Sequence, residues 1–167
     1  MPEVSLDLDI LAPIDRVWEA IVDVTRYPDL MTNVISVEIR RLDSPEVRRT
    51  AWSVVLKGSI LEWEEEEHID SARRLMSFGQ ISGDMAEFVG SWQVSKLSPS
   101  VSNVRLNVQF DIGIPLLADM LNPVAKRALR ENCADMLRGI ERRSRCDSDF
   151  GSPVELASTM IAAKGAE

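Results

Sequence analysis

Between residues 34 and 112 the chain consists almost entirely of strand-like segments separated by very short breaks. Six segments fit this description: 34–42, 47–56, 59–70, 73–80, 86–97 and 103–112. The breaks contain turn-forming pairs such as Lys57-Gly58 and Ser98-Pro99. Parallel neighbours would need crossovers of a dozen or more residues, so strands joined this closely pair as antiparallel hairpins. This region therefore predicts a meandering antiparallel sheet.

One strand and two helical stretches precede the meander, and one long helix follows it. Residues 3–11 alternate between apolar and polar side chains, which is the period of a half-buried strand. Residues 13–26 repeat apolar side chains at helical spacing, and the helix ends before Pro28, where a short helical turn begins. An apolar stripe predicts a long helix over 124–143, after a loop or short helix at 115–123.

Together these elements predict an α+β domain. A curved seven-stranded antiparallel sheet would wrap around the long C-terminal helix, with two short helices after the first strand. A sheet curled around one helix leaves space that side chains do not fill completely, so we expect an apolar cavity, the usual form of a ligand site. We expect one domain over residues 1–143 and a polar tail over 144–167, in which a short helix starts near Ser152-Pro153.

Composition and charge argue against several classes of protein. The 167 residues include 27 acidic and 19 basic side chains, and the resulting net charge of -8 disfavours binding to nucleic acids and anionic membranes. The only histidine, His68, is expected on the surface, and two cysteines without CxxC spacing complete no metal pattern, so no metal or cofactor is expected. The sequence shows neither a membrane span nor a signal-peptide core, which predicts a soluble cytoplasmic monomer or homodimer.

The segment 59–70 carries the strongest candidates for chemistry. Alternation places five of its side chains on one face: Leu61, Trp63, Glu65, Glu67 and Ile69. The apolar members assign this face to the cavity. Desolvation there raises a carboxyl pKa, and two neighbouring carboxyl groups move each other's titrations apart, so we predict Glu65 and Glu67 as catalytic groups. The competing interpretation is a solvated charge run that protects a strand end.

Further candidates for ligand contacts come from several elements. Trp52, Trp63 and Trp92 lie on three separate strands, and aromatic walls suit a planar or polyene ligand, although core packing explains them equally well. Besides these tryptophans, the predicted binding residues are Tyr27, Gln80, Asn132 and Met136. The segment 27–33 and the loop 114–122 are expected to flank the entrance.

A set of short motifs follows in order along residues 1–143. The motifs are Ala12-Pro13 with Val17-Trp18, Tyr27-Pro28-Asp29-Leu30, Leu61-Glu62-Trp63, Ile69-Asp70, Phe78-Gly79-Gln80-Ile81-Ser82-Gly83-Asp84, Gly90-Ser91-Trp92 and Phe110-Asp111-Ile112. In order and spacing they resemble the helix-grip superfamily of START lipid-transfer domains, birch-pollen-type ligand binders, coenzyme-Q-binding proteins and polyketide aromatase/cyclases. The likeness is closest to the polyketide cyclase/dehydrase and coenzyme-Q-binding branch. It implies a helix-grip fold and a small hydrophobic ligand.

The chain departs from the aromatase/cyclases of this superfamily at three positions. The resemblance implies two cavity arginines, at the positions of Glu67 and Gly79, and a tyrosine at the position of Val34. An arginine anchors an enolate or a carboxylate and a glutamate does not, so the usual aromatase chemistry is not expected. Either a carboxylate base supports different chemistry, or the protein only binds its ligand.

Two functions from different classes therefore stay open. The first is a cyclase or dehydratase that bends a polyketide-type chain in the cavity, excludes water and moves a proton through Glu65 or Glu67. For this enzyme the resemblance implies delivery of the chain by an acyl carrier protein. The second is a non-catalytic carrier of a quinone, lipid or polyketide, which the absent arginines favour and the inward carboxylates disfavour. A packed interior would instead indicate an interaction or stress-response domain.

Overall fold

The computed structural model describes residues 2–113 and 118–150 of the chain. Its elements are β1 (Glu3–Ile10), α1 (Ile14–Val22), η1 (Val24–Arg26), α2 (Tyr27–Leu30), β2 (Val34–Ser44), β3 (Val47–Leu56), β4 (Ser59–Asp70), β5 (Leu75–Gly83), β6 (Glu87–Ser98), β7 (Val101–Asp111) and α3 (Ala118–Phe150). The predicted α+β fold, with seven antiparallel strands and a long C-terminal helix, is confirmed.

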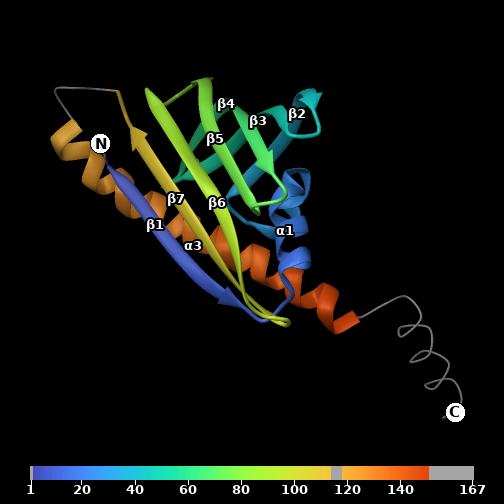
Figure 1. Ribbon diagram of the computed structural model, residues 1–167. Coiled ribbons are helices and arrows are strands. Elements are labelled where there is room, and N and C mark those ends of the chain that lie inside the picture. Colours follow the sequence, from blue (N-terminus) through green and yellow to red (C-terminus); the bar gives the residue numbers. More distant parts are fainter. Residues whose placement is uncertain (1, 114–117, 151–167) are drawn as a thin grey trace, which may run out of the picture.

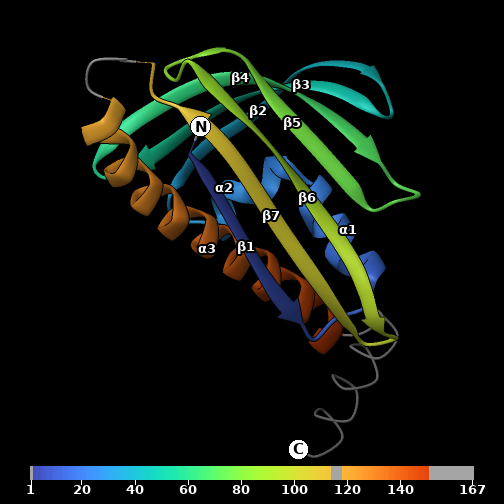
Figure 2. The same ribbon diagram turned by 60° about the vertical axis from the view of Figure 1, so that its left-hand side comes forward.

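All seven strands belong to one antiparallel sheet in the order β1-β7-β6-β5-β4-β3-β2. Each strand from β2 to β7 pairs with the next one along the chain, as the short breaks predict, and β1 returns to pair with β7. The sheet curls, and α3 runs diagonally across its concave side (Figures 1 and 2). The helices α1 and α2 pack on the same side, against α3.

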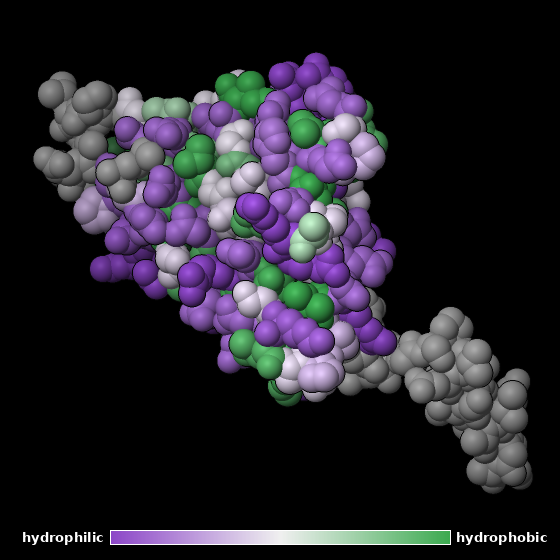
Figure 3. Space-filling model, viewed as in Figure 1, coloured by the Kyte–Doolittle hydropathy of each residue, from purple (hydrophilic) through white to green (hydrophobic). Residues whose placement is uncertain are grey.

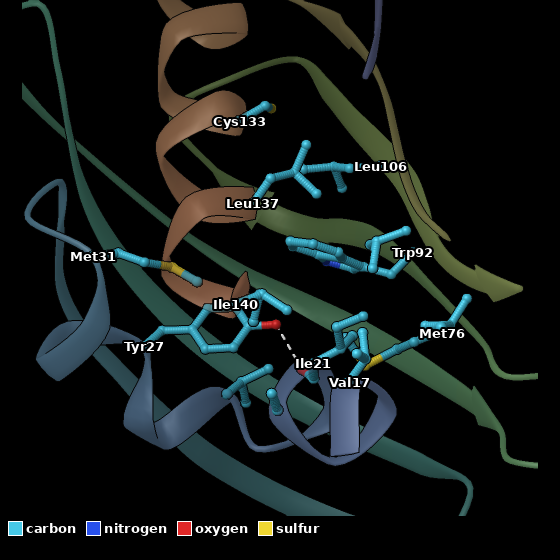
Figure 4. Close-up of a cluster of buried hydrophobic side chains, with 14 of the residues drawn as sticks. Val17, Ile21, Tyr27, Met31, Met76, Trp92, Leu106, Cys133, Leu137 and Ile140 are labelled. Atoms are coloured by element: carbon cyan, nitrogen blue, oxygen red, sulfur yellow. Dashed lines mark hydrogen bonds between the residues drawn. The ribbon is translucent and has the colours of Figure 1, made fainter. Parts of the chain in front are cut away.

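The core lies between the concave face of the sheet and the helices. α1 buries Val17 and Ile21 because its apolar side chains recur every three or four residues. In Figure 4, Leu137 of α3 and Leu106 of β7 point toward each other, and both are buried. The face seen in Figure 3 is mainly hydrophilic, with hydrophobic residues scattered singly or in small groups. Within the described residues, no helix combines the length and the apolar character that crossing a bilayer requires.

The long helix α3 extends beyond its prediction at both ends. It begins at Ala118 instead of after Pro123, so the prediction of a break at this proline was wrong. A proline so near the helix N-terminus removes a single intrahelical hydrogen bond, which packing against the sheet offsets. At the other end α3 continues to Phe150, past the predicted end at 143. Ile140 and Ser144 are fully buried, and this packing favours a longer helix.

Two further expectations concern segments that the structure describes only in part. The predicted entrance loop 114–122 is helical from Ala118 onward, and its first four residues lie outside the described part of the chain. Residues 144–150 of the predicted polar tail belong to α3. The short helix expected near Ser152 lies outside the described residues.

Gly90 in β6 leaves no room for a side chain. A Cβ at this position would lie 2.2 Å from the carbonyl oxygen of Asn107 and 2.6 Å from the ring of Phe78. We therefore expect Gly90→Ala to lower the free energy of unfolding by about 2 kcal/mol or more, because the backbone of the neighbouring strand must shift. Urea unfolding measures this loss.

Gly79→Ala in β5 is the matched control. Its Cβ would meet nothing closer than Val89 Cγ1 at 3.5 Å, an ordinary van der Waals contact. We expect this variant to unfold within about 0.5 kcal/mol of the unchanged protein. An equal loss of stability in the two variants would show that steric contact at Gly90 is not the cause.

Candidate functional site

A cavity of about 60 Å³ lies between the concave face of the sheet and α3. Its aromatic lining comes from β3 to β6 and comprises Trp52, Trp63, Phe78, Phe88 and Trp92. Helix α3 contributes Leu129, Asn132, Cys133 and Met136. The charged lining residues are Glu65 and Glu67, both from β4. The cavity is therefore apolar except for the two carboxyl groups on the sheet and a few polar atoms, such as the Asn132 amide, on α3.

The cavity is small because aromatic rings fill most of the space. The rings of Trp52 and Trp63 stack in parallel with centroids 5.9 Å apart, and the ring of Phe88 lies 5.1 Å from that of Trp63. For comparison, an apolar cavity of about 150 Å³ is known to bind benzene. The expected cavity exists, but a ring-sized ligand enters it only when lining side chains move.

The strand β4 directs two of its glutamates into this cavity. Glu65 and Glu67 are only 2% and 1% exposed, whereas Glu62 is exposed and Glu64 and Glu66 are partly exposed. This division follows from the alternation of side chains along a strand. The interpretation as a solvated charge run thus applies to the outer three glutamates and not to the inner two.

The buried partner of Glu67 is Arg48 on β3, which was not among the residues predicted from the sequence. Arg48 is 7% exposed, and its Nε donates to Glu67 Oε1 at 2.6 Å. Its Nη2 donates to the carbonyl oxygen of Val22 at the end of α1, also at 2.6 Å. A buried ion pair is tolerated only when hydrogen bonds satisfy both partners, as they do here.

The sequence carried a signal for this arginine. Alternation along β3 places Arg48 on the same face as Thr50 and Trp52, and all three are buried. The register between β3 and β4 then sets Arg48 directly opposite Glu67. The chain therefore carries a buried arginine bonded to a cavity glutamate, on the strand next to the one where the family resemblance implies a cavity arginine.

The two carboxyl groups differ in their electrostatic surroundings. Burial raises the pKa of Glu65 well above its ordinary value, and the charge of Glu67 raises it further. Burial also raises the pKa of Glu67, but Arg48 and hydrogen bonding from Thr50 act in the opposite direction. Since Arg48 pairs with Glu67 and not with Glu65, we assign the negative charge of the pair to Glu67 and the proton to Glu65. The pair then offers one acid and one base.

Two polar atoms on the cavity wall have no hydrogen-bond partner among the described residues. They are Nε1 of Trp63 and Oε2 of Glu65. The indole N–H of Trp63 lies near enough to lower the pKa of Glu65, but the two groups do not meet in hydrogen-bond geometry. Trp52 differs, because its Nε1 donates to Thr50 Oγ1 at 2.8 Å. Buried polar atoms without partners are costly, so this wall is suited to a polar group of a ligand.

Two of the predicted binding residues do not line the cavity. Tyr27 is fully buried in α2, where its hydroxyl donates to the carbonyl oxygen of Ile21 at 2.6 Å (Figure 4). Its ring packs edge-on against two cavity tryptophans, so it supports the wall from behind. The side chain of Gln80 turns toward the β5–β6 connection and donates to the carbonyl oxygen of Met85 at 2.6 Å. The remaining predicted binding residues line the cavity: Trp52, Trp63, Trp92, Asn132 and Met136.

Asn132 joins α3 to the sheet at the edge of the cavity. Its Nδ2 donates to the carbonyl oxygen of Val55 at 2.9 Å, and its Oδ1 accepts from Asn33 Nδ2 at 3.1 Å. The same Asn33 amide also donates to Asp135 at 3.1 Å. Asn132 lines a surface hollow beside Lys57 as well as the internal cavity, so it separates the two.

The residues outside this cluster offer little further chemistry. Burial raises the pKa of the Cys133 thiol to about 12, so this cavity cysteine is not a nucleophile at neutral pH. His68 is exposed and pairs with Glu66 at 2.8 Å, away from the cavity. Among the described side chains, no three His, Cys, Asp or Glu residues are grouped so that they could hold a metal ion.

Solved structures of other proteins share this fold. The protein TTHA0849 from Thermus thermophilus is 26% identical, with a TM-score of 0.82 over 88% of this chain and 99% of that one. The Zhui aromatase/cyclase from Streptomyces sp. R1128 is 20% identical, with a TM-score of 0.77 over 88% and 95%. A START superfamily protein from Mycobacterium smegmatis is 15% identical, with a TM-score of 0.73 over 86% and 97%. At these last two identities the likeness shows the fold alone.

A search of curated protein sequences finds no significant match to this chain. A family model described as polyketide cyclase / dehydrase and lipid transport matches residues 10–137, which is most of the sequence. The matched region runs from the end of β1 into α3 and includes every residue that lines the cavity. The chain therefore belongs to the polyketide cyclase / dehydrase and lipid transport family.

Proposed function

We propose that the protein is an enzyme resembling the polyketide cyclases and dehydratases, which binds a hydrophobic polyketide-type chain in its cavity and promotes intramolecular cyclisation or dehydration. The supporting observation is the pair of buried carboxyl groups, Glu65 and Glu67, on the wall of a mainly apolar cavity, with Arg48 bonded to Glu67. A cavity that only holds an apolar ligand gains nothing from two carboxyl groups and still incurs the free-energy cost of desolvating them.

A carboxyl pair that shares one proton can act as acid and base in the same turnover. In a dehydration, the carboxylate of the pair takes the proton from the carbon next to a carbonyl group. The bond between the neighbouring carbon and its hydroxyl breaks, a carbon–carbon double bond forms, and the proton of the other carboxyl leaves with the hydroxyl as water. The pair ends with as many protons as it began with, so no external acid or base is needed.

The rest of the cavity would position the substrate. Aromatic rings exclude water and favour planar, bent conformations of a chain, which brings its reacting carbons together. Met136 and Leu129 on α3 are side chains that can repack around a ligand larger than the present 60 Å³. By family likeness, an acyl carrier protein in the cytoplasm would deliver the chain.

The second candidate function is a non-catalytic carrier of a quinone, lipid or polyketide. The mainly aromatic and aliphatic lining of the cavity favours it. A protein that only binds its ligand would bury Glu65 and Glu67 at a free-energy cost without using them. We therefore rank the enzyme first.

Replacing Glu65 by glutamine removes the transferable proton while keeping the size and polarity of the side chain. We expect Glu65→Gln to lower the turnover of a short poly-β-ketone thioester by about a hundredfold or more, the usual contribution of general acid–base catalysis. Mass spectrometry follows the loss of water from this substrate, and calorimetry follows its binding, which is expected to survive.

The matched control is Glu64→Gln on the outer face of the same strand, where Glu64 faces Arg40 at 3.6 Å. Its turnover is expected to equal that of the unchanged protein. Unchanged turnover in Glu65→Gln would contradict the mechanism. Binding of the thioester without turnover by any variant would support the carrier function.

The raised pKa of Glu65 makes the stability of the protein depend on pH. The folded chain holds a proton that the unfolded chain releases near the ordinary value of 4.5. The stabilisation is therefore complete below this pH and is lost as the pH rises toward the folded-state pKa, by at most about 1.4 kcal/mol per pH unit. In Glu65→Gln this decline should disappear, and urea unfolding from about pH 4 to pH 8 measures it. Parallel curves for the two proteins would refute the assignment.

The ion pair of Arg48 and Glu67 is tested by a double-variant comparison. Arg48→Met leaves an uncompensated buried carboxylate, so we expect the free energy of unfolding at neutral pH to fall by about 3 kcal/mol or more. Adding Glu67→Gln removes that charge and should recover part of the loss. Urea unfolding of the single and double variants decides the matter, and equal losses would argue against a compensated charge on Glu67.

A further inference from the structure

The solvent-facing side of α3 is basic, although the chain as a whole is acidic. Residues 126–145 contain seven of the 19 basic side chains of the protein but only three of its 27 acidic ones. At helical spacing the exposed ones fall along one side of α3, over a length of about 30 Å. We call this set the basic stripe, and its members are Lys126, Arg127, Arg130, Arg138, Arg142 and Arg145.

The opposite side of α3 explains why the stripe faces solvent. Along residues 126–145 the helix buries an apolar set against the rest of the domain, namely Leu129, Cys133, Leu137 and Ile140. The helix forms an outer layer of the molecule, with the sheet on one side of it (Figure 2). The basic side chains that alternate with the apolar set are therefore directed away from the core.

Most charges of the basic stripe have no partner within the described part of the chain. Arg138 pairs with Asp135 at 2.6 Å, and Arg142 donates to the carbonyl oxygen of Leu30 at 2.5 Å. The other four form no ion pair or side-chain hydrogen bond with a described residue: Lys126, Arg127, Arg130 and Arg145. Like charges held this close together repel one another, so an acidic surface placed on the stripe would lower the electrostatic free energy.

The basic stripe runs beside the surface hollow that adjoins the cavity. On α3 this hollow is lined by Glu131 and Asp135, among others. Arg127 precedes Glu131 by one helical turn, and Arg138 is bonded to Asp135. Asn132 belongs to the lining of both the hollow and the internal cavity. A partner bound on the stripe would therefore sit next to the wall that separates the cavity from the surface.

An acidic protein fits the basic stripe better than other anionic partners do. A nucleic acid or an anionic membrane extends beyond one helix face and would meet the strongly acidic remainder of the chain. Residues 121–145 also contain no aromatic side chain that could stack on bases or anchor in a bilayer. A second copy of the chain would have to present a different face, and such head-to-tail contacts do not close into a symmetric dimer.

We propose that the basic stripe is the docking surface for an acidic carrier protein, which holds the substrate on a flexible arm and presents it at the hollow beside Asn132. The identity of the partner rests on the proposed function, in which a carrier protein delivers the chain. The location of the surface rests on the charges of α3 alone. Exposed charges of this kind accelerate the encounter of two proteins, and salt screens them.

The experiment measures binding of the full chain to a fluorescently labelled bacterial acyl carrier protein that bears its phosphopantetheine arm. Fluorescence anisotropy gives the affinity. We expect Arg127→Glu combined with Arg130→Glu to weaken binding by about tenfold or more, because two attractive contacts become repulsive. Binding of the unchanged protein should also weaken when the salt concentration rises from about 0.05 M to about 0.3 M.

The matched control is Lys96→Glu combined with Arg105→Glu, on β6 and β7. Both side chains are exposed and form no ion pair with a described residue, and the net charge changes by the same amount. We expect the affinity for the carrier protein to change by less than about twofold. Equal weakening in the two double variants would overturn the proposal, because net charge and not the stripe would then control binding. Absence of binding by the unchanged protein would overturn it as well.

Other partners of the stripe are tested with the same variants. A DNA duplex of about 20 base pairs and vesicles containing phosphatidylserine replace the carrier protein, and sedimentation velocity follows self-association. If one of these interactions is tighter than that with the carrier protein and is lost in the α3 double variant, the choice of an acidic protein is wrong.

The outcomes also separate this proposal from the proposed enzyme. Binding of the carrier protein that depends on Arg127 and Arg130, together with no turnover of the free thioester, supports the docking surface and removes the enzyme. Turnover of the free thioester that depends on Glu65, without binding of the carrier protein, does the reverse.

Discussion

The buried ion pair between Arg48 and Glu67 is the interaction on which the chemistry of this cavity depends. It joins neighbouring strands, and the second hydrogen bond of Arg48 reaches the Val22 carbonyl, so one side chain links the sheet to α1. Because Arg48 compensates Glu67, the proton of the carboxyl pair belongs to Glu65. The position of one arginine thus favours the charged form of one carboxyl group over that of the other.

The aromatic rings around this ion pair determine the strength of its electrostatic interactions. In a small, water-poor space the effective dielectric constant is low, so a few polar atoms suffice to orient a ligand and to hold a proton near it. A simple carrier would need only the rings, whereas the polar cluster adds a directional element. The combination connects membership of the polyketide cyclase / dehydrase and lipid transport family to an enzymatic proposal for this chain.

Local patterns predicted the seven strands and the inward orientation of Glu65 and Glu67, because alternation is fixed by the pleat of each strand. They did not reveal Arg48 as the partner of Glu67, since that contact depends on the register between two strands. The small size of the cavity depends on how the rings pack, which composition does not specify. At Pro123 local propensity indicated a break, but packing of α3 against the sheet outweighs it.

The backbone and the aromatic side chains determine different properties of the cavity, and this affects how substitutions change it. The sheet and α3 set the outline of the chamber, while Trp63, Phe88 and their neighbours set how much of it is empty. Exchanging one ring for a smaller side chain would enlarge the chamber without moving a strand. Ligand size can therefore diverge among such proteins through single substitutions, while the carboxyl groups on β4 and Arg48 on β3 stay in place.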